Sequence, residues 1–438
     1  MMRISMIKTA GLRRLLRPAA KVAMMIMIAA LTGANVAWAQ AAGTLDPTFG
    51  TDGTVTTTFT GDTSPVMMPV GAIEQSNGDI VVLSQFDFVS DSGTQIGLTR
   101  YTSAGELDTT FGTKGSTITA FSTFTFDPFA FALESNGEFL VAGTVGGTAS
   151  GALEFGLARF TASGVLDATF GTSGVAAVQI GTRPDAPSAF MLQPNGQILM
   201  GGFEDGGGKK QPGSLSVARF NSNGELDTMF GTGGFVLVTP KILGPEAFAL
   251  LSNGDYLAVG ENTSGTGGTV VEFSSTGVLR STVTTGTVTA SSPLQGLEDS
   301  PTVFEPNGSY VVANQTATSH DETTHPVVSL FSEAGVESTA FAATKIAFGG
   351  FGKNTGQAIA VQSNGQVIVG GFVANASPIF GGLARLDTNG DLDTTFGSGG
   401  TLAIDNGVNA LLIDNNGNID AIEATGNDGI VVARYLAN

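Results

Sequence analysis

The chain has two histidines, and both lie in the stretch Ser319-His320-Asp321-Glu322-Thr323-Thr324-His325. Imidazole and carboxylate groups bind zinc, so this stretch is a candidate metal site. In the helical zinc motif H-E-x-x-H, two histidines four positions apart lie on one side of a helix. Here they are five positions apart, between apolar runs that predict strands. A solvated polar loop is therefore the favoured interpretation.

A second stretch, residues 387–393, reads Asp-Thr-Asn-Gly-Asp-Leu-Asp, with oxygen donors at alternate positions as in a calcium-binding loop. That loop also needs glycine at its sixth position and glutamate at its twelfth, where this chain has Leu392 and Ser398. The corresponding residues 161–167 have lost most of these donors but keep the turn signal. Turn formation explains every copy. We therefore expect no cofactor, and calcium is the secondary interpretation.

Basic side chains offer two further candidates. Five arginines recur at one place in a repeated pattern, and could form an anion-binding ring: Arg100, Arg159, Arg219, Arg385 and Arg434. The favoured alternative is that each arginine lies along its own strand and pairs with a carboxylate of a nearby turn. The pair Lys209-Lys210 stands on a long glycine-rich stretch that lacks the spacing of a phosphate-binding loop. No catalytic residue is predicted.

A repeat positions all of these residues. Its first marker is a pattern close to Gly-x-Leu-Asp-x-x-Phe-Gly, which starts at Gly43, Gly105, Gly164, Gly224, Gly277, Gly335 and Gly390. Its second marker is an Asn-Gly pair in every copy, at Asn77, Asn136, Asn195, Asn253, Asn307, Asn364 and Asn416. The copies at Gly277 and Gly335 have lost part of the first marker, and looser turns are expected there. Seven repeats of about 57 residues follow.

Each repeat contains four short apolar or alternating runs, which predict strands. In the second full repeat they are residues 129–133, 138–142, 155–160 and 174–178, and the Asn-Gly pair separates the first two. Four antiparallel strands per repeat predict an all-β, seven-bladed β-propeller. The chain enters the pattern at residues 45–59 and leaves it after the third strand, residues 430–435. We therefore predict that the N-terminal strand completes the last blade and closes the ring.

These motifs resemble those of the delta-60 repeat proteins of bacteria. Units of that family have the pattern Leu-Asp-x-x-Phe-Gly-x-x-Gly, then an Asn-Gly or Asp-Gly hairpin, then Ala-Arg-Phe/Tyr. The similarity covers residues 43–438 and is strongest in the first four units and the seventh. The resemblance implies a β-propeller in an exported or surface protein, and it brings no established activity with it.

Residues 1–39 have the features of a signal peptide. Basic residues precede an apolar run at residues 22–31, and Ala37-Trp38-Ala39 is a cleavage signal. The run is shorter than the roughly 20 residues that span a bilayer, so we expect cleavage and not anchoring. The predicted domains are a signal peptide, 1–39, and a β-propeller, 40–438. The location is periplasmic or extracellular.

Composition limits the partners. The signal holds six of the 19 basic residues, so 13 remain against 38 acidic residues in the mature chain. This negative charge disfavours nucleic acid and anionic membranes. The expected partner is an extracellular or envelope protein or a glycan, and we expect a monomer. With no cysteine, the fold must be stabilised by burial alone.

Two functions remain open. The favoured one is a non-catalytic exported scaffold that binds its partner through one face. The Asn-Gly hairpins and Leu-Asp turns must share one face, the turn face, and the variable connections must share the other, the loop face. Candidate partner-binding residues of the loop face are Lys209, Lys210, His320, Asp321, Glu322 and His325. The alternative is a polysaccharide hydrolase or lyase, but the mature chain has no Trp on which a sugar could stack.

Overall fold

The computed structural model describes residues 40–59, 66–87, 94–147, 153–181, 185–204, 214–238, 242–262, 268–284, 302–305, 309–315, 325–333, 336–342, 344–348, 353–374, 380–425 and 429–437. The predicted signal peptide lies outside these residues. Ala41–Ala437 form one compact unit, to which the following description applies. None of the described segments is a helix long and apolar enough to cross a membrane.

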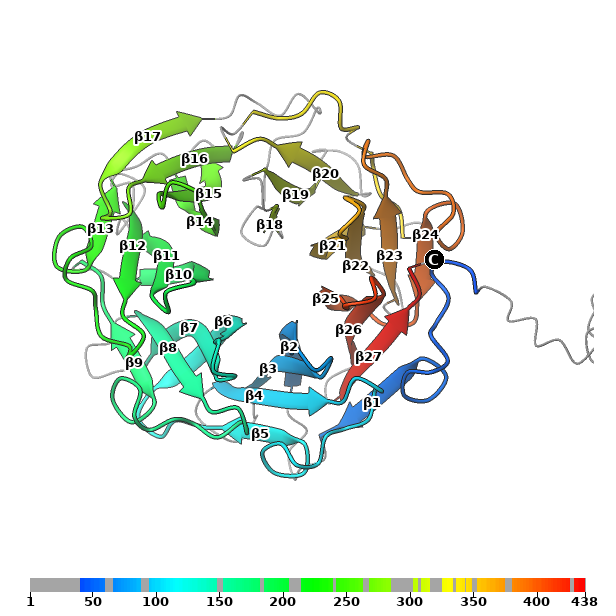
Figure 1. The fold of residues 1–438 in the computed structure, drawn as a ribbon, viewed down its shortest axis with the longest axis horizontal. Helices are drawn as coiled ribbons and strands as arrows, with labels where there is room; N and C mark the ends of the chain where they lie inside the picture. The colour runs from blue at the N-terminus through cyan, green and yellow to red at the C-terminus, as the bar shows by residue number, and fades with distance from the viewer. Residues whose placement is uncertain are drawn as a thin grey trace, which may run out of the picture. The chain divides into compact units, whose positions relative to one another are not determined.

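Seven antiparallel sheets stand around a common axis in this unit, and each is one blade (Figure 1). Blades one to three are β2 (Val66–Glu74), β3 (Ile80–Asp87), β4 (Thr94–Tyr101) and β5 (Ser116–Thr119); β6 (Thr125–Leu133), β7 (Phe139–Gly146), β8 (Glu154–Phe160) and β9 (Val175–Val178); β10 (Asp185–Leu192), β11 (Ile198–Glu204), β12 (Ser214–Phe220) and β13 (Phe235–Val238).

Blades four to seven repeat the order from inner to outer strand. They are β14 (Ile242–Leu250), β15 (Tyr256–Asn262), β16 (Gly268–Phe273) and β17 (Leu279–Thr284); β18 (Thr302–Phe304), β19 (Tyr310–Gln315) and β20 (Pro326–Phe331); β21 (Lys353–Val361), β22 (Val367–Ala374), β23 (Phe380–Leu386) and β24 (Thr401–Ile404); β25 (Val408–Ile413), β26 (Ile419–Thr425), β27 (Gly429–Tyr435) and β1 (Thr54–Thr58). Among the described residues of blade five, an isolated bridge between Val327 and Lys345 marks the outer edge beside β20.

The N-terminal strand closes the ring, as the sequence predicts. β1 pairs antiparallel with β27, from Thr54 opposite Ala433 to Thr58 opposite Gly429. The turn before β1 is built from both ends of the propeller, because the Gly43 N–H donates to the Leu436 carbonyl at 2.8 Å and the Leu436 N–H donates to the Thr44 carbonyl at 2.8 Å. Blade two makes the matching hydrogen bonds within the continuous segment 159–167. The closing turn is therefore a copy of the repeat turn that is split between the two chain ends.

The apolar core is divided into seven clusters, one for each pair of neighbouring blades. The phenylalanine of the repeat turn packs into six of these junctions, and the junction between blades four and five is the exception. Phe111 of blade one, for example, is fully buried with Phe126 and Phe139 of blade two, and meets the Phe139 ring edge-on at 6.0 Å between centroids. Apolar burial of this kind is the main force that holds the ring together.

The four tyrosines belong to these interior surfaces. Tyr101, Tyr256, Tyr310 and Tyr435 are all at least 94% buried, so none is a platform for a sugar ring.

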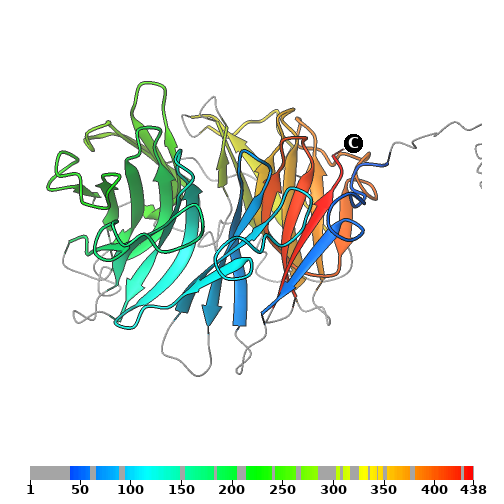
Figure 2. The ribbon, with the colours of Figure 1, turned by 60° about the horizontal axis from the view of Figure 1, so that its bottom comes forward.

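The strands run across the thickness of the ring, so consecutive connections within a blade fall on alternate faces (Figure 2).

Candidate functional site

The recurring arginines link blades and do not form an open anion site. In blade two, Arg159 Nε and Nη2 lie 2.8 and 2.6 Å from Asp167 Oδ2, which belongs to the repeat turn. Arg159 Nη1 donates to the Ser222 carbonyl of blade three at 3.0 Å, and the guanidinium lies 4.9 Å from the centre of the Phe170 ring. The arginine therefore holds its own turn and reaches the next blade, as the favoured interpretation of the sequence predicts.

Three other blades repeat this link. The pairs are Arg100 with Asp108, Arg219 with Asp227, and Arg385 with Asp393, and the arginines also donate to carbonyls of the next blade at Ala162, Ser275 and Ala437. The last glycine of the Leu-Asp-x-x-Phe-Gly pattern adds a second bond across each junction; the Gly112 N–H, for example, donates to the Ser163 carbonyl at 2.9 Å. Most of the recurring polar groups of the turn face thus take part in hydrogen bonds and ion pairs that link neighbouring blades.

Turn hydroxyls keep the turn carboxylates ionised. The Thr169 hydroxyl donates to Asp167 Oδ1 at 2.7 Å and is the main reason that the pKa of Asp167 is lowered, with the Thr169 N–H and Arg159 acting in the same direction. Asp108 has a lowered pKa for the same first reason, its bond from the Thr110 hydroxyl. Charged carboxylates in these turns secure the arginine links at neutral pH.

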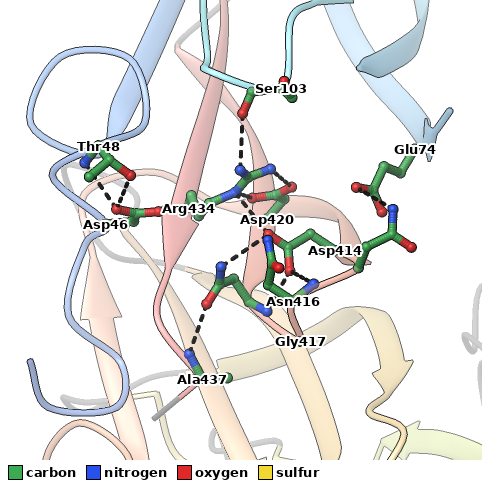
Figure 3. A network of polar contacts seen from close by, with 12 residues as sticks. Asp46, Thr48, Glu74, Ser103, Asp414, Asn416, Gly417, Asp420, Arg434 and Ala437 are labelled. Atoms are coloured by element: carbon green, nitrogen blue, oxygen red, sulfur yellow. Dashed lines mark hydrogen bonds and ion pairs between the residues drawn. The ribbon is translucent and has the colours of Figure 1, made fainter. Parts of the chain in front are cut away.

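Blade seven differs, because its arginine uses another partner. Arg434 Nε and Nη2 donate to the two oxygens of Asp420 at 2.7 and 2.8 Å, and Nη1 donates to the Ser103 carbonyl of blade one at 3.2 Å (Figure 3). Asp414 lies 3.5 Å from Arg434 Nε. The turn carboxylate Asp46 instead accepts hydrogen bonds from Thr48. Asp420 therefore takes over the pairing that the turn carboxylate makes in blades one, two, three and six.

The carboxylates at the ring closure, Asp420, Asp414 and Glu74, have the contacts of a structural cluster and not those of a catalytic site. Asp420 is fully buried, and both its oxygens accept hydrogen bonds from Arg434. Glu74 of blade one has a raised pKa, first because it is partly buried, and it accepts a hydrogen bond from Asn415 at 3.2 Å. A glycosidase needs two carboxyl groups that reach the sugar and an attacking water. Asp420 cannot be reached in this way, so the cluster fastens blade seven to blade one.

Glu423 of β26 is the described carboxyl group whose pKa is nearest to neutral. Burial raises its pKa to about 7, against the hydrogen bond from Asn406 Nδ2 at 3.0 Å, and the charge of Asp405 adds to the rise. A carboxyl group that is protonated near neutral pH is a candidate general acid. Glu423 is 4% exposed, whereas Asp405 is exposed. No sequence motif marked this residue, because its pKa depends on packing between strands.

Of the predicted partner-binding residues, the structure describes His325. Its Nδ1 lies 3.2 Å from the Ile346 carbonyl and 3.4 Å from Asn354 Nδ2, so this half-buried side chain contacts the start of blade six. Lys209, Lys210, His320, Asp321 and Glu322 lie outside the described residues. Their placement relative to His325 therefore stays a prediction.

The stretch that resembles a calcium loop forms a turn. Asp387 Oδ1 accepts hydrogen bonds from the N–H groups of Asn389 and Asp391 at 2.9 and 3.0 Å, and Asp393 pairs with Arg385. Among the described residues, no group of three or more His, Cys, Asp or Glu side chains is arranged to hold a metal ion.

Comparison with known proteins identifies the repeat. A family model described as a domain of unknown function (DUF5122) beta-propeller matches residues 75–111, 134–170, 193–230 and 362–396. No curated protein matches the chain.

Several solved structures match the chain at low sequence identity. A protein of unknown function from Dyadobacter fermentans is 12% identical, with a TM-score of 0.47, over 87% of this chain and 100% of that one. A carbohydrate-active enzyme of family AA12 from Trichoderma reesei is 10% identical, with a TM-score of 0.37, over 92% and 100%. An α-L-arabinofuranosidase from Fusarium graminearum is 9% identical, with a TM-score of 0.40, over 85% and 93%. These likenesses are too low to transfer a function.

The four matched segments each begin at an Asn-Gly hairpin and end at the turn phenylalanine or next to it, in blades one, two, three and six. They agree with the delta-60 resemblance of the sequence. Four of the seven repeats therefore match the DUF5122 β-propeller family model.

Proposed function

We propose that the mature chain is a non-catalytic exported scaffold that binds an extracellular or envelope partner through its loop face. One observation supports this most strongly. The recurring polar groups of the turn face are paired with each other across the blade junctions, as the Arg159 link to Asp167 and Ser222 shows. A surface whose polar groups are already paired offers few of them to a partner.

The loop face differs in sequence from blade to blade. Its connections range from residues 426–428 between β26 and β27 to residues 285–301 between β17 and β18, and they have different compositions. Loops on a rigid frame commonly carry binding residues. This supports a partner site on the loop face, where Lys209, Lys210, His320, Asp321, Glu322 and His325 are the candidate residues.

Export follows from the sequence features of residues 1–39 and belongs to this proposal. An exported chain without disulfides has to be stabilised by its packing, which the seven junction clusters provide. N-terminal sequencing of the protein recovered outside the cytoplasm tests it. A start at Gln40 is expected, and an uncleaved chain in the inner membrane would show an anchor instead.

Glu423 favours a second candidate function, that of a polysaccharide hydrolase or lyase. Burial raises its pKa to about 7, which suits a general acid, and the charge of the exposed Asp405 adds to the rise. The scaffold ranks first because Glu423 is almost completely buried.

A glycan array combined with hydrolysis assays on envelope polysaccharides separates the two functions. The scaffold proposal expects binding to a protein or glycan without release of reducing ends or unsaturated products. Turnover that disappears in Glu423→Gln would establish the enzyme and defeat the scaffold.

A further inference from the structure

A pocket of about 530 Å³ lies on the turn face between blades two and three. Blade two contributes Glu134, Asn136 and Arg159 to its wall, and blade three contributes Leu192, Pro194 and Ser222. The wall therefore combines a carboxylate and amide groups with aliphatic side chains. A cavity of this size holds a small organic molecule.

Glu134 has an unsatisfied oxygen in this wall. Its side chain is 10% exposed, and its Oε2 accepts no hydrogen bond from the residues that the structure describes. The nearest cationic atom, Arg159 Nη1, is 3.9 Å away, beyond hydrogen-bonding distance. Burial raises the pKa of Glu134, which shows that its charge is poorly compensated. Buried polar atoms normally have hydrogen-bond partners, so a ligand that donates a hydrogen bond would satisfy this oxygen.

The protein does not supply that donor from Arg159. Its Nε and Nη2 are bound to Asp167, and its Nη1 donates to the Ser222 carbonyl. Glu138 Oε2 also lies 3.4 Å from Arg159 Nε. Three carboxylates thus share one guanidinium beside the pocket, so the local potential is negative and favours a cation.

The position of Glu134 in the repeat also carries a carboxylate in blades five and seven, at Glu305 and Asp414, and it carries Leu251 in blade four. Glutamine stands there in blades one, three and six, at Gln75, Gln193 and Gln362. Gln362 Nε2 donates across the junction to the Gly417 carbonyl of blade seven at 2.8 Å. A carboxylate cannot make that bond to the corresponding Gly196 of blade three. The amide oxygens of Gln75 and Gln362 also accept no hydrogen bond from the described part of the chain, but they carry no charge.

We propose that the pocket between blades two and three binds a small aliphatic primary amine, with its ammonium group at Glu134 Oε2 and its alkyl chain against Leu192 and Pro194. An ammonium group supplies three hydrogen-bond donors and one positive charge, which match the unsatisfied oxygen and the excess of carboxylates. The aliphatic wall suits the carbon chain. This site is on the turn face, so it does not depend on the proposed partner site of the loop face.

Calorimetric titration of the chain that begins at Gln40 with n-butylammonium tests this site, with 1-butanol and butyrate as matched uncharged and anionic probes. Saturable binding of the amine at one site is expected, together with at least tenfold weaker binding of both other probes. No binding of the amine, or equal binding of butanol, would overturn the proposal.

Glu134→Gln is the decisive variant, because the chain already places glutamine at this position in three other blades and the fold should tolerate it. We expect its affinity for n-butylammonium to fall at least tenfold. Glu106→Gln, the same change at an exposed turn of blade one, should leave the affinity unchanged. Leu192→Lys is an independent variant, since blade one has Glu74 at that position; its ammonium group should occupy the site and abolish binding. Unchanged affinity in either pocket variant would refute the site.

Discussion

At the scale of single residues, the same types of side chain have different roles according to what surrounds them. Asp167 is ionised in its turn because Thr169 and Arg159 donate to it, whereas Glu423 retains its proton near neutral pH because it is buried with one donor, Asn406. The repeat predicts the pairing of Asp167 with Arg159, but Thr169 occupies a variable position of the motif, where blade three has Met229. The environment of Glu423 depends on the contact between β26 and residue 406, which no local pattern encodes.

Glu423 makes the stability of the fold depend on pH. Its pKa rises from 4.5 to about 7 on folding, so the folded chain holds a proton that the unfolded chain loses. The contribution of Glu423 to the free energy of unfolding is therefore fully present below about pH 4.5. It is lost as the pH rises toward 7, which lowers the free energy of unfolding by roughly 3 kcal/mol. In Glu423→Gln, which keeps an oxygen that Asn406 can reach, this loss should disappear.

Urea unfolding at pH 4.5, 6 and 8 measures the effect. The variant should be more stable than the wild-type chain at pH 8 and similar to it at pH 4.5. Glu106→Gln, at an exposed position, serves as the control and should follow the wild-type profile. Parallel profiles for Glu423→Gln and the wild type would show that the group does not titrate in this range.

At the scale of elements, the repeat turn is the unit that the sequence predicts best. The glycine that ends the Leu-Asp-x-x-Phe-Gly pattern has a positive φ in the described turns, for example 56° at Gly231. A Cβ atom there would lie 2.2 Å from the Phe235 carbonyl oxygen. Only glycine fits this close approach of two backbone segments.

Gly231→Ala should therefore be costly. The left-handed conformation alone costs about 1–2 kcal/mol for alanine, and the collision with the backbone of β13 adds to it. Gly233→Ala is the matched control, because Gly233 has a φ of 69° in the same turn but open space around its Cβ position. Thermal unfolding should show a clearly larger loss for Gly231→Ala. Equal losses would mean that the turn can move to accommodate a side chain.

Other elements were less predictable. At blade four the degenerate marker gives no loose turn; β17 begins at Leu279, directly after a short hairpin, and pairs with β16. The inner strands also carry register shifts, as after Pro69 and Pro128 but also after Gly356. Proline alone does not account for them, because the shift recurs without it.

At the scale of the whole molecule, ring closure is the property on which everything else rests. The sequence predicts it from the phase of the repeat, and the pairing of β1 with β27 confirms it. The split turn between Gly43 and Leu436 and the pairing of Arg434 with Asp420 add closure contacts that the motif did not foretell. At this junction the repeat turn is formed by two separate segments of the chain and not by one continuous segment.

Deletion of residues 45–60 should open the ring. It removes β1 and the buried Phe49, and it leaves β27 as an unpaired edge strand. We expect a loss of several kcal/mol and of solubility, because total stability is typically only about 5–15 kcal/mol. The chain that begins at Gln40 is the reference. If both proteins melt at the same temperature, β1 does not close the ring.

The proposed binding function gives the two faces of the ring different roles. Matched charge changes on the two faces distinguish them. Lys209→Glu with Lys210→Glu lowers the charge of the predicted loop face by four. Glu106→Lys with Glu225→Lys raises the charge at exposed positions of the turn face by four, a change of the same size and opposite sign.

The most direct test measures the affinity of these two double variants and of the chain from Gln40 for the glycan or protein that the array and binding assays identify, with turnover followed in parallel. We expect at least tenfold weaker binding for the loop-face variant, unchanged binding for the turn-face variant, and no turnover by any of them. Loss of binding in the turn-face variant alone, or turnover of the bound glycan, would contradict a non-catalytic scaffold that binds through its loop face.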